Sequence, residues 1–228
     1  MYDINGFLYP IGSFGAFVYL DLSTKPLFMK KIFLAAIIGG LILFIWQFIS
    51  WAGADFHNST QQYTEKQQAI MEFLKTQQLE EGGYVMPILP KTATMEEWQE
   101  LMKDRQGKPW ASIQYHTAMN DNMILNMVRS FIINVLTVFL FCWIIGQFKN
   151  TSFRTILSAA LLTGLIVFFN VPYINFIWYK SFDIWVHLAD AIVSWGICGA
   201  WLGWWFNRKS KALSDLKVSE QTVTVAAD

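Results

Sequence analysis

The chain has 228 residues, of which 54% are hydrophobic, 17% aromatic and only 15% charged, with a formal net charge of zero. Soluble domains carry about 25% charged residues, so this composition predicts an integral membrane protein in contact with the lipid bilayer. It argues against a nucleic-acid partner, because no basic stripe is available to neutralise phosphates. The two cysteines, Cys142 and Cys198, lie in apolar runs, and no disulfide framework or zinc-binding spacing is present.

Residues 1–28 contain scattered aromatics, glycines and a proline without an uninterrupted apolar span. Met29, Lys30 and Lys31 follow, and a methionine, two lysines and an apolar run are typical of a bacterial start. Two interpretations stay open for this N-terminal extension. Either the native protein begins at Met29, or residues 1–28 form a short interfacial or disordered arm. Neither interpretation assigns a function to the segment.

The first apolar span, Ile32–Trp51, predicts a transmembrane helix at residues 29–52. A cleaved signal peptide is the alternative, because lysines precede the span and Ala52-Gly53-Ala54 resembles a cleavage site. The apolar run of about twenty residues exceeds the ~7–15 of a signal peptide, and three further spans follow it. A retained helix is therefore favoured.

Residues 53–127 form the one long polar stretch of the sequence, and acids outnumber bases in it. The pattern predicts a helix over Thr60–Glu81, an extended run at Tyr84–Pro90, and a short helix that begins with a capping box at Thr94-Met95-Glu96-Glu97. Ala111–Tyr115 is predicted to be extended. Because this stretch has too little apolar material for its own core, we expect it to lean on the helix ends or on a partner protein.

Three more apolar spans lie within residues 128–207, and each is long enough to cross a ~30 Å hydrocarbon layer as a helix. They are Ser130–Phe148, Ile156 to about Tyr173, and Phe182–Phe206. A polar tail, predicted to be mobile, occupies residues 208–228. The sequence therefore predicts an all-α membrane protein: a four-transmembrane-helix bundle with a small, mostly helical extracytoplasmic insertion between helices 1 and 2.

Basic residues in the short loops and tails predict the orientation of the bundle. They are Lys25, Lys30, Lys31, Lys149, Arg154, Arg208, Lys209, Lys211 and Lys217, and four spans put all of them on one side. The opposite short loop contains Lys180 alone. The positive-inside rule then places both termini in the cytoplasm and residues 53–127 outside, in a multi-pass protein of the bacterial inner membrane.

The last span carries ionisable side chains that a simple anchor does not need. Asp183, His187 and Asp190 fall within about 60° of one another around a helix, and Ser194 extends the same stripe. Lipid would leave these groups unsatisfied, so the stripe must face protein or water. We call these four residues the candidate polar ladder.

Two interpretations of the polar ladder stay open. In the structural one, its side chains bond to polar groups on neighbouring helices, and Arg129 at the rim of the second span is the candidate ion-pair partner of Asp183. In the functional one, the ladder is a proton or cation site. The structural interpretation is favoured, and no catalytic residue and no metal site are assigned.

His57 and His116 flank the polar stretch between the first two spans. Together with His187 they could converge at one face of the membrane, but their spacing matches no metal-binding motif. We therefore expect both to be surface or interface histidines.

Three glycines form a narrow face on the last span: Gly196, Gly199 and Gly203. The spacing of Gly199 and Gly203 permits close helix contact, either within the bundle or between copies of the chain. Packing within the bundle is favoured, and an oligomer stays open.

Short motifs occur in a defined order along the chain. They are Ser50-Trp51 and Phe56-His57 after the first span, Gly82-x-Tyr84-x-x-Pro87 in the polar stretch, and Ala189-Asp190, Trp195 and Gly199 in the last span. On these residues the chain resembles, from Met29 to Phe206, a family of small bacterial inner-membrane proteins. The resemblance implies a retained first helix and a location in the bacterial envelope, and it transfers no catalytic residue.

For function, the sequence favours a non-enzymatic envelope protein, an accessory or interaction subunit with a membrane or periplasmic protein partner. The alternative is a small proton or cation conduit, or a membrane enzyme, centred on Asp183, His187 and Asp190. No Walker loop, nucleophile elbow, His-Glu-x-x-His or Rossmann glycine pattern occurs, so neither an enzyme class nor a cofactor is indicated.

Overall fold

The computed structural model describes residues 26–119, 121–148 and 151–225. The N-terminal extension predicted at residues 1–28 lies outside this part of the chain, except for its last residues, where the first helix begins. Within the described residues, four helical segments are long and apolar enough to cross a membrane. They run over Met29–Gly53, Met123–Gly146, Phe153–Tyr179 and Ile184–Arg208. This confirms the prediction of four apolar helices of membrane-spanning length.

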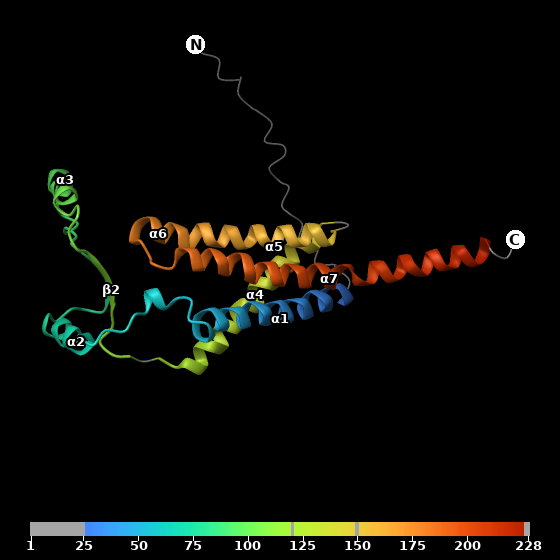
Figure 1. Cartoon of the computed structure of the whole chain (residues 1–228), viewed down its shortest axis with the longest axis horizontal. Helices are drawn as coiled ribbons and strands as arrows, with labels where there is room; N and C mark the ends of the chain where they lie inside the picture. The colour runs from blue at the N-terminus through green and yellow to red at the C-terminus, as the bar shows by residue number, and fades with distance from the viewer. Residues whose placement is uncertain (1–25, 120, 149–150, 226–228) are drawn as a thin grey trace, which may run out of the picture.

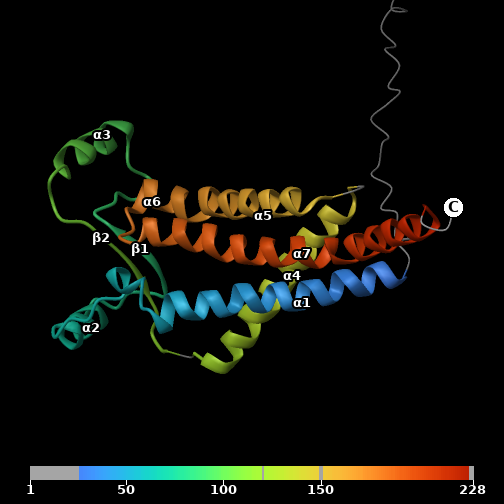
Figure 2. The same ribbon diagram turned by 45° about the vertical axis from the view of Figure 1, so that its right-hand side comes forward.

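The spanning helices form two antiparallel pairs (Figure 1). Helix α1 (Pro26–Phe48) packs along α4 (Met123–Gly146), and α5 (Phe153–Phe168) packs along α7 (Ile184–Val225). Contacts between α1 and α7 join the two pairs, and these two helices lie side by side in Figure 2 as well. The buried core includes Ile32, Leu43, Val138, Phe141, Ile156, Trp195, Cys198 and Leu202.

The glycine face of the last span lies against α5. A Cβ atom built on Gly199 would lie 2.5 Å from the Cβ of Ala160, and one built on Gly203 would lie 2.7 Å from Cδ2 of Phe153. Gly196 is less confined, since its Cβ would lie 3.5 Å from Cδ2 of Leu161, an ordinary contact. In this chain, the close approach that two of the three glycines allow is therefore a contact within the bundle.

Side chains on the outward faces of the spanning helices are large and apolar. Examples are Phe33, Leu140, Ile166 and Ile197, all of which are exposed in the isolated chain. An exposed apolar surface of this extent is unusual for a soluble protein but suits contact with lipid tails.

The third span is longer than the sequence predicts. After α5, a π-helical turn at Phe169–Tyr173 contains Pro172, and helix α6 (Ile174–Tyr179) then continues the span to Lys180, whose φ is 49°. Proline removes one backbone donor and usually breaks a helix, but the wider π-helical turn accommodates it here. The predicted end of the third span, at about Tyr173, is therefore six residues too early.

Helix α7 continues well past the apolar span, to Val225, through the segment predicted as a mobile polar tail. No glycine or proline occurs after Gly203, so no residue in the described part of this segment interrupts the helix. The extension is visible as the free red helix at the right of Figure 1.

The polar stretch between α1 and α4 contains two short helices and two strands. Helix α2 spans Gln67–Thr76 and α3 spans Met95–Asp104, while β1 (Gly82–Met86) pairs antiparallel with β2 (Ala111–Tyr115). The capping box at Thr94 is confirmed, since its hydroxyl accepts from the Glu97 N–H and the Glu97 carboxylate accepts from the Thr94 N–H.

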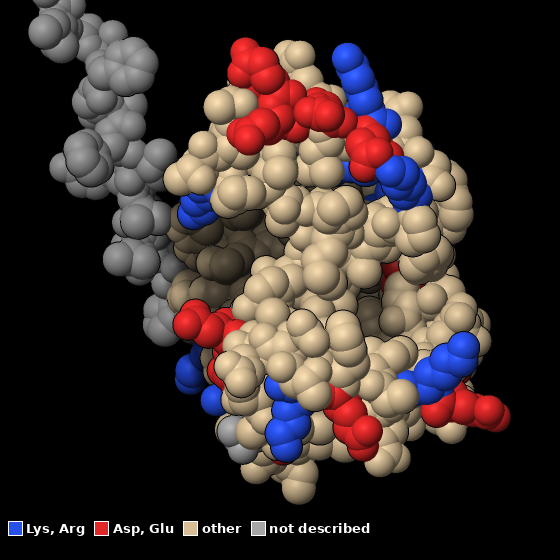
Figure 3. Space-filling model, turned by 90° about the vertical axis from the view of Figure 1, so that its left-hand side faces the viewer, with Lys and Arg blue, Asp and Glu red and all other residues tan. Residues whose placement is uncertain are grey.

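The helix predicted over Thr60–Glu81 is shorter than expected, because only residues 67–76 are α-helical. Neither α2 nor α3 buries a side chain. Isolated short helices are only marginally stable in water, and packing of an apolar face normally stabilises them. Because α2 buries no side chain, no packing stabilises the flanking residues as helix, and α2 is shorter than predicted. Figure 3 views this end of the molecule, where charged side chains of both signs are scattered over a hollowed, mostly uncharged surface.

One polar contact ties the start of β1 to the chain after β2. The Glu81 carboxylate accepts hydrogen bonds from the Thr117 hydroxyl at 2.7 Å and from the Thr117 N–H at 3.0 Å. These bonds favour the charged form and lower the pKa of Glu81 below its ordinary value. The contact closes the end of the strand pair where β1 begins and β2 ends.

Candidate functional site

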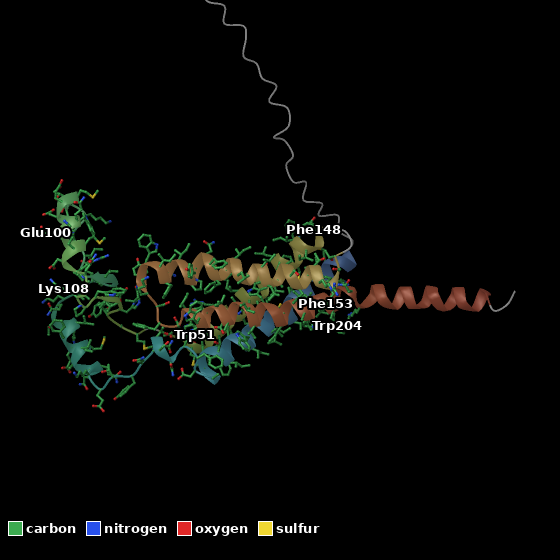
Figure 4. All side chains as sticks on the ribbon, turned by 45° about the horizontal axis from the view of Figure 1, so that its top comes forward. Trp51, Glu100, Lys108, Phe148, Phe153 and Trp204 are labelled. Carbon is green, nitrogen blue, oxygen red and sulfur yellow. The ribbon has the colours of Figure 1, made fainter. Side chains whose placement is uncertain are left out.

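A group of ionisable side chains lies where the end of α1 meets the start of α7. His57 comes from the segment that follows α1, Asp183 immediately precedes α7, and His187 and Asp190 belong to its first turns. We call these four residues the histidine–carboxylate cluster. His57 and Asp183 are almost completely buried, with 1% and 3% of their surface exposed. Figure 4 labels Trp51 at this end of the bundle, and Phe153 and Trp204 at the opposite end.

His57 is the central residue of the cluster, because both of its ring nitrogens meet a carboxylate. Its Nδ1 lies 2.6 Å from Oδ2 of Asp183, and its Nε2 lies 3.0 Å from Oδ2 of Asp190. A neutral imidazole carries one N–H and therefore donates only one of these two bonds. The second contact requires a further positive charge, which an additional proton or a metal ion can supply.

The segment around His57 fixes the position of the ring. The N–H and the hydroxyl of Thr60 both donate to the His57 carbonyl, at 3.0 and 2.8 Å, in a single 3₁₀ turn. The Phe56 N–H donates to the carbonyl of Ser50 at 3.0 Å, which turns the chain back toward α1. Trp51 stacks on the imidazole, with ring centroids 3.8 Å apart and planes 7° from parallel. Backbone bonds and one aromatic face therefore hold the ring in place.

Asp183 immediately precedes α7, at the position where an acidic side chain usually caps a helix. Its side chain instead contacts the histidines of the cluster. Its backbone carbonyl accepts from the N–H groups of Val186 and His187, at 2.9 and 3.1 Å. Its Oδ2 lies 2.6 Å from His57 and 3.3 Å from Nε2 of His187. Its Oδ1 is buried and has no hydrogen-bond partner among the described residues. A buried carboxylate oxygen without a donor is costly and calls for an explanation.

Asp190 is held by donors from the last turn of α1 and from the π-helical turn Ile49–Gly53 that follows it. Its Oδ1 accepts from the Trp46 indole N–H at 2.9 Å and from the Ser50 hydroxyl at 2.8 Å, and the hydroxyl also lies 3.0 Å from Oδ2. Trp46 and Ser50 are four residues apart in the continuous helical segment Met29–Gly53, and both donate to the same carboxylate. With His57 as a third neighbour, this carboxylate is satisfied on both oxygens.

The structure brings together three of the four residues of the polar ladder. Asp183, His187 and Asp190 all join the cluster, whereas the Ser194 hydroxyl donates to the backbone carbonyl of Asp190 at 2.6 Å. Ser194 therefore lies beside the cluster without contacting its ionisable groups through its side chain.

The predicted ion pair between Arg129 and Asp183 is wrong. Arg129 is exposed, and the ion pairs of Asp183 in the described part of the chain are with His57 and His187. The prediction matched the two residues by depth in the membrane but ignored which helices pack together. Arg129 belongs to α4, which packs along α1 rather than along α7. Asn134 on the same helix bonds to Gln47 of α1 at 2.8 Å.

The expectation that His57 is a surface or interface histidine is also wrong, whereas His116 is exposed as predicted. Sequence periodicity could not find His57, because it lies outside the spanning helix and 126 residues away from Asp183. A usable signal was its place in the Ser50-Trp51 and Phe56-His57 motifs, which mark the end of the first span.

The cluster has the donor types of a metal site as well as those of a proton site. His57, Asp183 and His187 each offer a ligand atom, and the three atoms all lie within 4.8 Å of one another. No metal site was predicted from the sequence, since the donors are too far apart along the chain to form a local motif. No family model, curated protein or solved structure matches the chain, so function is inferred from the geometry of this cluster.

Proposed function

We propose that this chain is a multi-pass protein of the bacterial inner membrane whose function depends on a cation held by the histidine–carboxylate cluster. The cation is a proton or a metal ion, and the cluster lies at the extracytoplasmic end of α1 and α7. The observation that carries this proposal is the burial of His57 between two carboxylates, Asp183 and Asp190.

Charge balance supports a functional role over a purely structural one. Within the described residues, the ion pairs of Asp183 and Asp190 are all with histidines, and none is with lysine or arginine. Burying charged carboxylates is costly unless each charge is fully compensated. A contact that only holds two helices together can be made at a lower desolvation cost by neutral side chains. The hydrogen bond between Gln47 and Asn134 elsewhere in the bundle is an example.

The orientation part of the proposal rests on the basic residues of the loops and tails. It places both termini in the cytoplasm and the segment with α2, α3, β1 and β2 outside. The resemblance to a family of small bacterial inner-membrane proteins supports the same location.

We expect a cysteine introduced by Gln77→Cys to react with a membrane-impermeant maleimide added to intact cells. Gln77 is exposed, and the native Cys142 and Cys198 are buried, so the background should be low. A Lys211→Cys protein should react only after the membrane is opened. Labelling of position 211 in intact cells would refute the proposed orientation.

The functional role is tested by isosteric removal of the carboxylate charges. We expect Asp183→Asn and Asp190→Asn proteins to insert into the membrane and to fail to complement a deletion strain, because both variants bind the cation more weakly than the wild type. Asp104→Asn changes an exposed carboxylate on α3 and should complement fully. Insertion is checked by size-exclusion chromatography in mild detergent. Full complementation by the Asp190→Asn protein would contradict the functional role and leave the cluster with a purely structural one.

A second candidate function is an accessory role through a protein partner, and one observation favours it. Apolar side chains of the segment between α1 and α4 are exposed, including Tyr63 at 76% and Phe73 at 61%. A cavity of about 390 Å³ also lies beside β1 and α6, lined by residues that include Val85, Trp110 and Trp178. Exposed apolar surface that lipid does not cover is typical of a protein–protein contact.

The accessory role is tested by a pull-down in mild detergent followed by mass spectrometry. We expect Phe73→Ser to remove a partner that the wild-type chain and a Gln68→Ser control both retain. Equal recovery with Phe73→Ser would rule out this surface as the contact.

A further inference from the structure

We infer that the histidine–carboxylate cluster binds a first-row divalent transition-metal ion of the Zn²⁺ type, through His57 Nδ1, His187 Nε2 and a carboxylate oxygen of Asp183. This inference rests on the proposed function and identifies the cation. It assigns ligand roles to three side chains and a supporting role to Asp190.

The donor atoms lie close enough together to bind a single small ion after short movements. Zinc binds nitrogen and oxygen ligands at about 2.0–2.2 Å, so ligand atoms in a tetrahedral site lie roughly 3.3 Å apart. Here His187 Nε2 lies 3.3 Å from Asp183 Oδ2, and His57 Nδ1 lies 2.6 Å from the same oxygen. The three ligand atoms lie within 4.8 Å of one another, so they need to move relative to one another by no more than ~1.5 Å.

Asp190 is arranged as a supporting residue for His57. A metal-binding histidine usually donates its second ring N–H to a carboxylate, which sets the tautomer and the ring orientation. Asp190 Oδ2 lies 3.0 Å from His57 Nε2, and it is fixed in turn by Trp46 and Ser50. If His57 donates its Nε2 proton to Asp190, its Nδ1 lone pair faces Asp183, as a ligand would need.

The unpartnered oxygen of Asp183 is an independent sign of a ligand. Asp183 is 3% exposed, and its Oδ1 finds no donor among the described residues. A carboxylate that binds a metal through either oxygen no longer needs a protein donor for that atom. An ion that contacts Oδ1 as well as Oδ2 would remove the cost of burying Oδ1.

The total charge favours a divalent ion over a single proton. With two ionised carboxylates and neutral imidazoles, a divalent ion makes the cluster neutral, whereas one added proton leaves a net charge of −1. A neutral centre is cheaper to bury at the end of a membrane span. The donor types then select the metal, because Mg²⁺ and Ca²⁺ prefer all-oxygen sites and imidazole suits zinc and its neighbours.

Three protein ligands leave a fourth position for water or a substrate, as in catalytic rather than structural zinc sites. Trp51 covers one face of His57, with ring centroids 3.8 Å apart, and thereby restricts access from that side. His187 is half-buried and marks the more accessible side of the cluster.

The test is direct metal binding by the full-length protein, purified in mild detergent and treated with EDTA. Titration with Zn²⁺ alone, followed by isothermal calorimetry, should show one ion per chain. We expect His187→Gln to abolish this binding and Asp190→Asn to weaken it about 10–100-fold, as loss of a supporting residue does. His116→Ala changes an exposed histidine outside the cluster and should bind like the wild type.

His187→Gln is chosen as the main variant because it removes a ligand without emptying the buried position of His57. Substitution with Co²⁺ gives a second measurement, since a tetrahedral site with two imidazoles absorbs visible light far more strongly than hydrated Co²⁺. A folded wild-type protein that binds no Zn²⁺, or binds it equally well with His187→Gln, would overturn the inference.

The outcomes separate this inference from the proposed function. If Asp190→Asn fails to complement but the wild type binds no Zn²⁺, the metal assignment is wrong and the cation of the proposed function is a proton. If Zn²⁺ binds at the cluster but Asp183→Asn and Asp190→Asn complement fully, the metal site stands and the proposed function is wrong.

Discussion

Replacing His57 with alanine is expected to lower the free energy of unfolding by roughly 3–5 kcal/mol, the range for removal of one member of a buried ion pair. The side chain is 1% exposed and contacts both Asp183 and Asp190. Its loss leaves two carboxylates facing a cavity and also removes the partner on which Trp51 stacks. Unfolding in mixed micelles, followed by tryptophan fluorescence, measures the change.

The control is His116→Ala, which removes an exposed histidine of the same chain and should change stability by no more than about 0.5 kcal/mol. The double variant His57→Ala/Asp183→Asn should recover part of the loss, because it also removes one of the two uncompensated charges. A His57→Ala protein that loses less than about 1 kcal/mol would contradict the central position of His57 in the cluster.

Much of the membrane architecture was predictable from sequence because the signals are local and long. An apolar run of about twenty residues predicts a membrane-spanning helix regardless of which other helices that helix contacts. The stripe of Asp183, His187 and Asp190 was predictable for the same reason, since helical periodicity alone puts the three on one face. The helix boundaries were less predictable. Pro172 normally ends a helix, and only the π-helical turn at Phe169–Tyr173 lets the third span continue through it.

The partners of that stripe depend on contacts between distant parts of the chain, which periodicity does not encode. His57 reaches Asp183 across 126 residues and Asp190 across 133. Whether α1 or α4 faces the start of α7 is decided by helix packing. Here α1 supplies Trp46, and the π-helical turn after it supplies Ser50, to Asp190. The predicted pairing of Arg129 with Asp183 is wrong because it was based on their similar depth in the membrane. Depth does not determine toward which neighbouring helix a side chain points.

The second large change in stability is expected at Gly199, where α7 packs against α5. We expect Gly199→Ala to lower the free energy of unfolding by roughly 1–3 kcal/mol, the usual cost of overpacking a core. The new Cβ would lie 2.5 Å from the Cβ of Ala160, which is fully buried. Two methyl groups have no rotamers by which to avoid each other, so the helices must separate, and the loss is measured by the same unfolding assay in mixed micelles.

Gly196→Ala is the matched control, because it adds the same methyl group to the same helix where the nearest atom is 3.5 Å away. It should be neutral or slightly stabilising, since alanine is a better helix former than glycine by up to about 1 kcal/mol. The exchange Gly199→Ala/Ala160→Gly moves the methyl group from α5 to α7 and should restore most of the stability lost in the single variant. If the exchange is as unstable as Gly199→Ala alone, the loss does not come from the contact between these two positions, and the close approach of α5 and α7 at Gly199 is wrong.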